Sequence, residues 1–249
     1  TGRTIIGLEK SSNGEILFEG KSLSKFNREE HKDFCQKVQM IFQDPYSSLN
    51  PRITVAEAIA EPLRVHNLVN GSEIGQRVTD LLKKVDLPPE FGQRYPHEFS
   101  GGQRQRISIA RALALNPKLI ICDEAVSALD VTIKAQVINL LMSLQEQLGL
   151  TYLFISHDLA VVERISHRIA VMYLGQIVEL GSREDIFENP THSYTKNLLS
   201  AVPVADPRLR RTEKTIEASE IPSVIKNMDY KPNLVRHQEI SPGHYVAIE

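Results

Sequence analysis

The feature that most constrains the fold is a glycine-rich helix start, followed in the sequence by a buried strand that ends in two carboxylates. Ser100 precedes Gly101 and Gly102, and apolar residues then recur at helical spacing until Pro117. Ser100 is a good N-cap because its hydroxyl can accept from a free N–H of the first turn. The two glycines let the backbone approach a ligand without an intervening Cβ. Since a helix start carries partial positive charge and free N–H groups, this loop suits an anion such as phosphate.

The second half of this feature is the strand 119–122, which is apolar throughout and ends at Asp123 and Glu124. In an open α/β sheet, ligands bind at the carboxyl ends of the strands. A Ser-Gly-Gly helix start is by itself most often only a cap, and an apolar strand that ends in acids can simply enter a turn. The two together favour a ligand site.

Strands alternate with helices along much of the chain, which predicts an α/β fold with a mainly parallel sheet. Strands are expected at 15–19, 38–42, 119–122 and 151–156, and a long amphipathic helix at 131–148. The runs 169–173 and 176–180 predict a hairpin around Leu174 and Gly175, which would give the sheet an antiparallel edge. The pattern therefore predicts one α/β sheet with helices between its strands.

Two further regions stand apart from this alternation. Amphipathic helices are expected at 54–67 and 72–85, so the segment around them is interpreted as a helical insert between strands. Their apolar stripes are expected to be core. From Ala201 onward, prolines recur often enough to break any long element, and we expect this tail to be an extended appendix.

Composition bounds the class of protein. The chain has 249 residues, 41% of them hydrophobic, which is enough for one large or two small domains. No apolar run approaches the roughly 18 residues of a transmembrane helix, and the formal charge of −2 gives no reason to expect a nucleic-acid partner. Cys35 and Cys122 show no metal-ligand spacing and indicate a reducing compartment.

One segment imitates a phosphate-binding loop. A P-loop reads G-x-x-x-x-G-K-[ST], with four residues between the glycines, whereas five residues separate Gly14 from Gly20-Lys21-Ser22. Those five include Ile16, Leu17 and Phe18, which favour a strand. We therefore predict a hairpin strand and its turn here, and no other segment fits a P-loop.

Several motifs, in order, resemble those of the ABC-transporter ATPases. Gln43 resembles the Q-loop glutamine, Phe99–Gln103 the signature loop with Phe in place of the usual Leu, Asp123 and Glu124 the Walker B pair, Ser127–Asp130 the D-loop, and His157 the switch histidine. The resemblance implies a P-loop NTPase-like ABC ATPase fold. It places a RecA-like core, truncated at its N-terminus, at residues 1–53 and 117–200, a helical signature subdomain at 54–116, and a peptide-importer-type extension at 201–249.

The resemblance also implies a chemistry, with ATP as substrate and Mg²⁺ as its ion. Glu124 and His157 are implied as catalytic residues: Glu124 would polarise the attacking water, and His157 would sense the γ-phosphate. Asp123 would hold Mg²⁺ directly or through water. Gln43 would contact the ion or the water and relay its state to the membrane partner.

Nucleotide contacts are implied for a larger set, namely Gln43, Ser100, Gly101, Gly102, Gln103 and Asp130. Two subunits of this family sandwich nucleotide, so the signature loop would act on the ATP of a partner. Asp130 would pair across the dimer interface, or would equally well cap the following helix. Arg104, Arg106 and Arg111 are either phosphate contacts or part of a solvated or salt-bridged helix face.

Within the family, the segments 43–52, 94–100 and 189–195 resemble ATPases of oligopeptide and dipeptide importers, and nickel and glutathione importers share these features. The implied partners are transmembrane permeases, a second ATPase subunit that is a copy or a paralogue and, indirectly, an extracytoplasmic solute-binding protein. The implied location is the cytoplasmic face of the bacterial inner membrane. Alternatives are a non-catalytic half that only supplies its signature loop, and a soluble ABC protein of DNA repair or translation, which the tail disfavours.

The family's P-loop lies just before a segment such as Thr1–Leu8. We therefore expect the sequence to begin immediately after that loop. The isolated chain is accordingly expected to bind ATP weakly or not at all, because the main phosphate cradle and its lysine would lie upstream.

Overall fold

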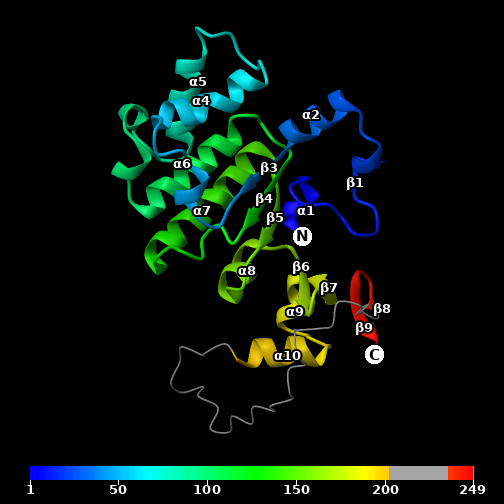
Figure 1. Ribbon diagram of the computed structural model, residues 1–249. Helices are drawn as coiled ribbons and strands as arrows, with labels where there is room; N and C mark the ends of the chain where they lie inside the picture. Colours follow the sequence, from blue (N-terminus) through cyan, green and yellow to red (C-terminus); the bar gives the residue numbers. More distant parts are fainter. Residues whose placement is uncertain (202–234, 249) are drawn as a thin grey trace. The chain divides into compact units, whose positions relative to one another are not determined.

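Two compact units make up the described part of the chain. The computed structural model describes residues 1–201 and 235–248, and these divide into Thr1–Asp158 and Leu159–Glu249 (Figure 1). The first unit holds the parallel strands of the predicted ATPase core together with the helices predicted for the insert, whereas residues 159–200 of that predicted core fall in the second unit. The finer domain division given above stays a prediction. Most of the predicted extension, residues 202–234, lies outside the described residues.

A parallel sheet forms the centre of the first unit. Its strands β3 (Val38–Ile41), β4 (Leu119–Asp123) and β5 (Thr151–Ile155) lie in the order β3-β4-β5, with Ile41 opposite Cys122 and Cys122 opposite Phe154. The central strand is the most hydrophobic and is fully buried at Ile120, Ile121 and Cys122. The predicted parallel sheet is confirmed, and its register brings the carboxyl ends of the three strands to one edge.

Helices start where their capping residues predict. Ser100 caps α6 (Gly101–Leu113), Asp130 caps α7 (Val131–Leu148) and Thr54 caps α4 (Val55–Val65). Alongside α4 lie α5 (Ile74–Lys84) and the 3₁₀ helix η2 (Pro89–Gln93), and the short α3 (Pro45–Ser48) packs against α6. A second 3₁₀ helix, η3 (Pro96–Glu98), precedes α6 in the chain. The predicted stripes of α4 and α5 are core, with Ile59, Leu63, Leu81 and Leu82 at most 1% exposed. A fully buried side chain of this size contributes about 1.5–3 kcal/mol.

The N-terminal segment confirms the hairpin and excludes a phosphate loop at Gly20. After α1 (Gly2–Ile5), strands β1 (Leu17–Phe18) and β2 (Lys21–Ser22) pair antiparallel across Glu19 and Gly20, both with positive φ. Then follow η1 (Leu23–Lys25) and α2 (Arg28–Lys37), which begins in a capping box at Asn27. The ring of Phe34 packs edge-on against Phe18 and Phe26, so the hairpin and α2 share an aromatic core.

The second unit differs from the sequence prediction in its sheet and in its tail. Its elements are α8 (Leu159–Ile165), β6 (Arg168–Tyr173), β7 (Gln176–Ser182), α9 (Arg183–Phe187), α10 (Ser193–Ser200), β8 (Arg236–Ser241) and β9 (His244–Ile248). The predicted hairpin β6–β7 forms, but it belongs to a separate antiparallel sheet of order β6-β7-β9-β8. The end of the tail is therefore a second hairpin, whose turn is Pro242-Gly243. Proline fixes φ for the first turn position and glycine takes the positive φ of the second.

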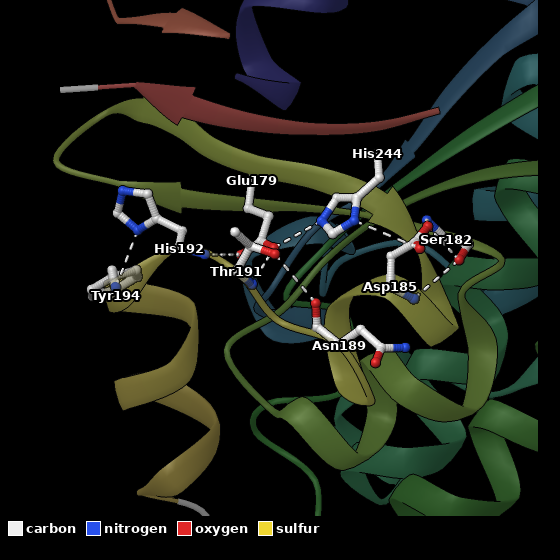
Figure 2. Close-up of polar contacts among 8 residues, drawn as sticks. All are labelled: Glu179, Ser182, Asp185, Asn189, Thr191, His192, Tyr194 and His244. Carbon is white, nitrogen blue, oxygen red and sulfur yellow. Dashed lines mark hydrogen bonds and ion pairs between the residues drawn. The ribbon is translucent and has the colours of Figure 1, made fainter. Parts of the chain in front are cut away.

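A buried polar cluster attaches the C-terminal hairpin to the rest of this unit (Figure 2). Glu179 of β7 is fully buried, and its carboxylate accepts from the backbone N–H groups of Thr191 at 2.8 Å and His192 at 3.1 Å. His244 of β9 places Nε2 at 2.8 Å from Glu179 Oε1 and Nδ1 at 3.6 Å from Asp185 Oδ1. One carboxylate thus connects β7, β9 and the start of α10.

Candidate functional site

Three polar side chains meet at the carboxyl edge of the parallel sheet. Gln43 follows β3, Glu124 follows β4 and His157 follows β5. Gln43 Nε2 donates to Glu124 Oε2 at 2.6 Å, and His157 Nδ1 lies 3.0 Å from Glu124 Oε1. Each partner takes a different carboxylate oxygen, so Glu124 is oriented from two sides.

The backbone at Glu124 is strained in a way that directs its side chain. Glu124 has a φ of +49°, which a residue other than glycine rarely adopts. Such a conformation costs about 1–3 kcal/mol and persists only where neighbours impose it. Here the Glu124 N–H donates to Ile155 O at 2.9 Å, and Ser127 Oγ donates to Glu124 O at 2.9 Å. Residues held in such rare conformations cluster at active sites and ligand-binding sites, so the strain marks Glu124 as a candidate functional residue.

Accessibility differs among the site residues. The Glu124 side chain is 29% exposed and that of His157 is 72% exposed. Asp123, the last residue of β4, is partly buried. The site thus has a sheltered carboxylate with an exposed imidazole beside it, which is the arrangement that a ligand arriving from solvent requires.

The signature loop is ordered by a reciprocal cap. Ser100 Oγ accepts from the Gln103 N–H at 3.3 Å, and Gln103 Oε1 accepts from the Ser100 N–H at 3.0 Å. Gly102 has a packing role besides the nucleotide contact predicted for it, which stays a prediction. A Cβ there would lie 2.3 Å from Cγ2 of Ile133, so this glycine makes room for α7. Gly101 is more open, with its nearest neighbour, Leu129 Cδ2, at 3.7 Å.

The D-loop aspartate takes the second of its two interpretations within this chain. Asp130 Oδ1 accepts from the Ile133 N–H at 3.0 Å and so caps α7. Its proposed pairing across a dimer interface concerns a partner chain and stays a prediction. The cap fixes the direction of α7 as it leaves the sheet edge.

The three arginines of α6 bind the chain's own backbone. Arg104 is 6% exposed and donates through Nε to Pro96 O at 2.7 Å, and Arg106 donates through Nη1 to Val85 O at 2.9 Å. Arg111 donates through Nη1 to Ser48 O at 2.6 Å, and burial lowers its pKa. These side chains hold the loops around α6, so the phosphate-contact interpretation is not supported by their geometry.

The structure therefore brings Gln43, Glu124 and His157 together, with Asp123 adjacent in the chain, and holds the signature residues in a cap of their own. Sequence reasoning missed two residues near this site. Lys134 Nζ lies 2.6 Å from Asp158 Oδ2, which ties α7 to the residue after His157. The two residues lie 24 positions apart in the sequence, so no local pattern predicts their contact. The available indication was a lysine in the first turn of α7, the helix that begins near this edge of the sheet.

Comparison with known proteins identifies the family. The family model for ABC transporters matches residues 2–127 of this chain. The chain belongs to the ABC transporter family. A second family model, for the C-terminal region of oligopeptide/dipeptide transporters, matches residues 178–227. This ABC transporter chain thus carries the two family matches in the order that its motifs predicted.

Curated relatives agree with both matches. The chain is 56% identical over 247 residues to the glutathione import ATP-binding protein GsiA of Salmonella paratyphi A, and equally to GsiA of Escherichia coli K12. The alignment covers 99% of this chain but 40% of each relative. The ABC transporter chain described here therefore spans well under half the length of these curated relatives.

Solved structures share the fold. CbiO1 of Clostridium perfringens, described as part of the ABC transporter complex cbiONQ, aligns with a TM-score of 0.67 and 27% identity over 75% of this chain and 72% of that one. The ATP-binding cassette MJ0796, solved as a dimer in a post-hydrolysis state with ADP and Pi, gives a TM-score of 0.64 and 29% identity over 73% of this chain and 78% of that one. Within residues 1–201 and 235–248, no helix combines the length and apolarity needed to cross a bilayer.

Proposed function

We propose that this chain is the ATP-hydrolysing subunit of an ABC importer of peptides, and that Glu124 is its general base. The observation that carries the proposal is the convergence of Gln43 and His157 on the two oxygens of Glu124 at the carboxyl edge of the sheet. Nucleotide hydrolysis consists mostly of positioning a water and neutralising phosphate charge. This cluster supplies an oriented carboxylate beside an exposed imidazole.

Each residue then has a distinct task. A carboxylate has about four lone-pair positions, so Glu124 can accept from a water while Gln43 and His157 hold its orientation. Proton acceptance by Glu124 would make the water nucleophilic, an effect typically worth ~10²–10⁴ in rate. Because His157 presents Nδ1 to Glu124, its second ring nitrogen remains to contact the γ-phosphate.

The residues present fit Mg²⁺ held with a nucleotide. Among the described residues, no group of three or more His, Cys, Asp or Glu side chains forms a metal site. Mg²⁺ is, however, commonly bound by one or two carboxylates together with substrate phosphates and waters. Asp123 offers a hard oxygen ligand at the end of β4, and Gln43 retains its amide oxygen because Nε2 faces Glu124. Bound Mg²⁺ would neutralise phosphate charge, with these two side chains as its protein ligands.

The assembly follows from the signature loop. Gly101 and the capped turn of Ser100 and Gln103 present the start of α6, where free N–H groups favour phosphate. We assign this loop, with Asp130, to the nucleotide of a second ATPase subunit. The subunit would work with transmembrane permeases at the cytoplasmic face of the inner membrane, and a solute-binding protein would deliver the substrate outside it.

The substrate class rests on the second family match. Residues 178–227 match the C-terminal region of oligopeptide/dipeptide transporters, and the curated relatives are named for glutathione import. Glutathione is itself a small peptide, so both point to short peptides. ATP-dependent uptake of a labelled dipeptide, a labelled pentapeptide and labelled glutathione by the assembled transporter would rank the three as substrates. Uptake of none of them would contradict a peptide substrate.

The decisive experiment is Glu124→Gln in the transporter assembled from full-length subunits in lipid vesicles. We expect ATP to bind normally and hydrolysis to fall by about 10²-fold or more. Glu146→Gln, on the exposed face of α7, is the matched control and should hydrolyse ATP normally. Normal turnover in Glu124→Gln, combined with its loss in Ser100→Arg, would overturn the proposal in favour of a non-catalytic half that serves a partner's site.

A further inference from the structure

The first turn of α7 is attached to two functional segments of the unit Thr1–Asp158. Ile133 fills the space beside Gly102 in the signature helix α6, where a Cβ would lie 2.3 Å from its Cγ2. The next residue, Lys134, places Nζ 2.6 Å from Asp158 Oδ2, and Asp158 directly follows His157. One helical turn therefore contacts both the signature helix and the loop of the switch histidine.

The Lys134–Asp158 ion pair is sheltered and geometrically fixed. The side chains are only 21% and 30% exposed, so solvent screens their attraction less than that of a surface pair. The Lys134 N–H donates to Asp130 O at 2.8 Å, and the Asp158 N–H donates to Ser156 Oγ at 3.1 Å. Both partners therefore project from ordered backbone, which lowers the entropy cost of pairing.

His157 depends on this anchoring because little packing holds its ring. Its side chain is 72% exposed, so the position of the imidazole depends on its contact with Glu124 and on the backbone between β5 and Asp158. Ser156 continues from β5, which is paired with β4 along its length. The Lys134–Asp158 pair fixes the other end of this short loop.

We propose that Lys134 is a positioning residue that couples the signature helix to the switch histidine. Through Asp158 it holds His157 at Glu124, and through Ile133 the same turn of α7 follows any movement of α6. Because the signature loop serves a partner's nucleotide while His157 serves the chain's own, this turn connects the two sites. The inference rests on the proposed function of the chain.

Kinetics of the assembled transporter test the catalytic consequence. Lys134→Met keeps the aliphatic stem but removes the charge, and we expect kcat to fall about tenfold to a hundredfold, as a small misplacement of a reacting group does, with KM nearly unchanged. Lys134→Arg should restore most of kcat. Lys118→Met is the matched control, since Lys118 also pairs with a carboxylate, Glu19, but at the start of β4. An unchanged kcat in Lys134→Met, or an equal loss in Lys118→Met, would overturn the coupling.

Hydrogen exchange on the full chain tests the positioning without ATP. We expect the amides of His157 and Asp158 to exchange about tenfold faster in Lys134→Met, because the loop loses an anchor, and to be unaffected in Lys118→Met. Unchanged exchange would show that Lys134 does not position the loop. If hydrolysis proved independent of Glu124, the proposed function would fail, while the exchange rates would still decide whether this anchor exists.

Discussion

Ile133 of α7 occupies the space that a side chain at Gly102 would need, with Cγ2 only 2.3 Å from the position of an added Cβ. Real Cβ atoms essentially never show so short a contact. Gly102 therefore allows α6 and α7 to approach closely, and the signature loop presents its remaining residues from a helix that is fixed by this contact. The glycine is a packing requirement of the chain itself.

Gly102→Ala should destabilise the chain although alanine favours helix. Overpacking costs about 1–3 kcal/mol, and a contact as short as 2.3 Å places this site toward the upper end, which outweighs a gain of about 1 kcal/mol in helix propensity. Urea unfolding of the full chain measures it. Gly101→Ala, whose Cβ would meet Leu129 at an ordinary 3.7 Å, is the control. Adding Ile133→Ala to Gly102→Ala should recover part of the loss, and no recovery would contradict the contact as the cause.

Replacing Asp130 separates its cap from an intersubunit role. Asp130→Ala should cost about 1 kcal/mol, because the Ile133 N–H loses its acceptor at 3.0 Å, whereas Asp130→Ser should retain most of the cap. Thermal unfolding measures the difference. If Asp130 acts only as a cap, the assembled transporter should lose ATP hydrolysis only to the extent that the variant is destabilised, so Asp130→Ser should hydrolyse ATP nearly normally. Loss of hydrolysis in the stable Asp130→Ser variant would instead place the carboxylate at the dimer interface.

Part of the candidate site could be predicted because its sequence pattern is local. Glu124 follows an apolar run, and parallel strands end at one edge of their sheet, so its proximity to Gln43 and His157 is consistent with the order of the strands. The positive φ of Glu124 could not be predicted, since it depends on the hydrogen bond that its N–H donates to Ile155 O and on the one that its carbonyl accepts from Ser127 Oγ. The distribution of Gln43 and His157 over its two carboxylate oxygens could not be predicted either. Such tertiary restraints leave no periodic signal in the sequence.

The features that the sequence did not predict involve partners that are distant in sequence. The tail was expected to be extended because prolines break regular elements, yet Pro242-Gly243 is a turn signal between two short strands. The packing of Gly102 against Ile133 was not predicted, because the two residues lie in different helices. The buried position of Glu179 was not predicted either, since its partners Thr191, His192 and His244 come together only in the folded unit.

Glu179→Gln should loosen the C-terminal hairpin. The amide keeps the shape, but its NH₂ group would face N–H donors that now bind a carboxylate oxygen. A buried donor left without an acceptor costs about 1–3 kcal/mol. Faster hydrogen exchange at the amides of β9 is the expected result. His237→Gln is the control, because His237 Nε2 contacts Ile177 O at 2.8 Å from an exposed position. Equal protection of β9 in Glu179→Gln and wild type would contradict the anchoring role.

Cys122 should report on opening of the sheet beneath Glu124. Burial raises the pKa of its thiol to about 12, from a model-compound value of 9.0. A raised pKa disfavours the reactive thiolate, so at pH 8 the fraction ionised in the folded chain is only on the order of 10⁻⁴. Cys35 is partly exposed, and burial raises the pKa of its thiol as well.

We therefore expect an alkylating reagent at pH 8 to modify Cys35 first and slowly, and to reach Cys122 only after urea unfolding, with intact mass and peptide mapping as the measurement. Cys35→Ser gives the control in which the folded chain should gain no label. Above pH 9 the unfolded chain ionises its thiol while the folded chain does not, so stability should fall as the pH rises toward 12. Labelling of both cysteines at equal rates in the folded chain would mean that β4 opens readily, and a strained Glu124 could not be held on such a strand.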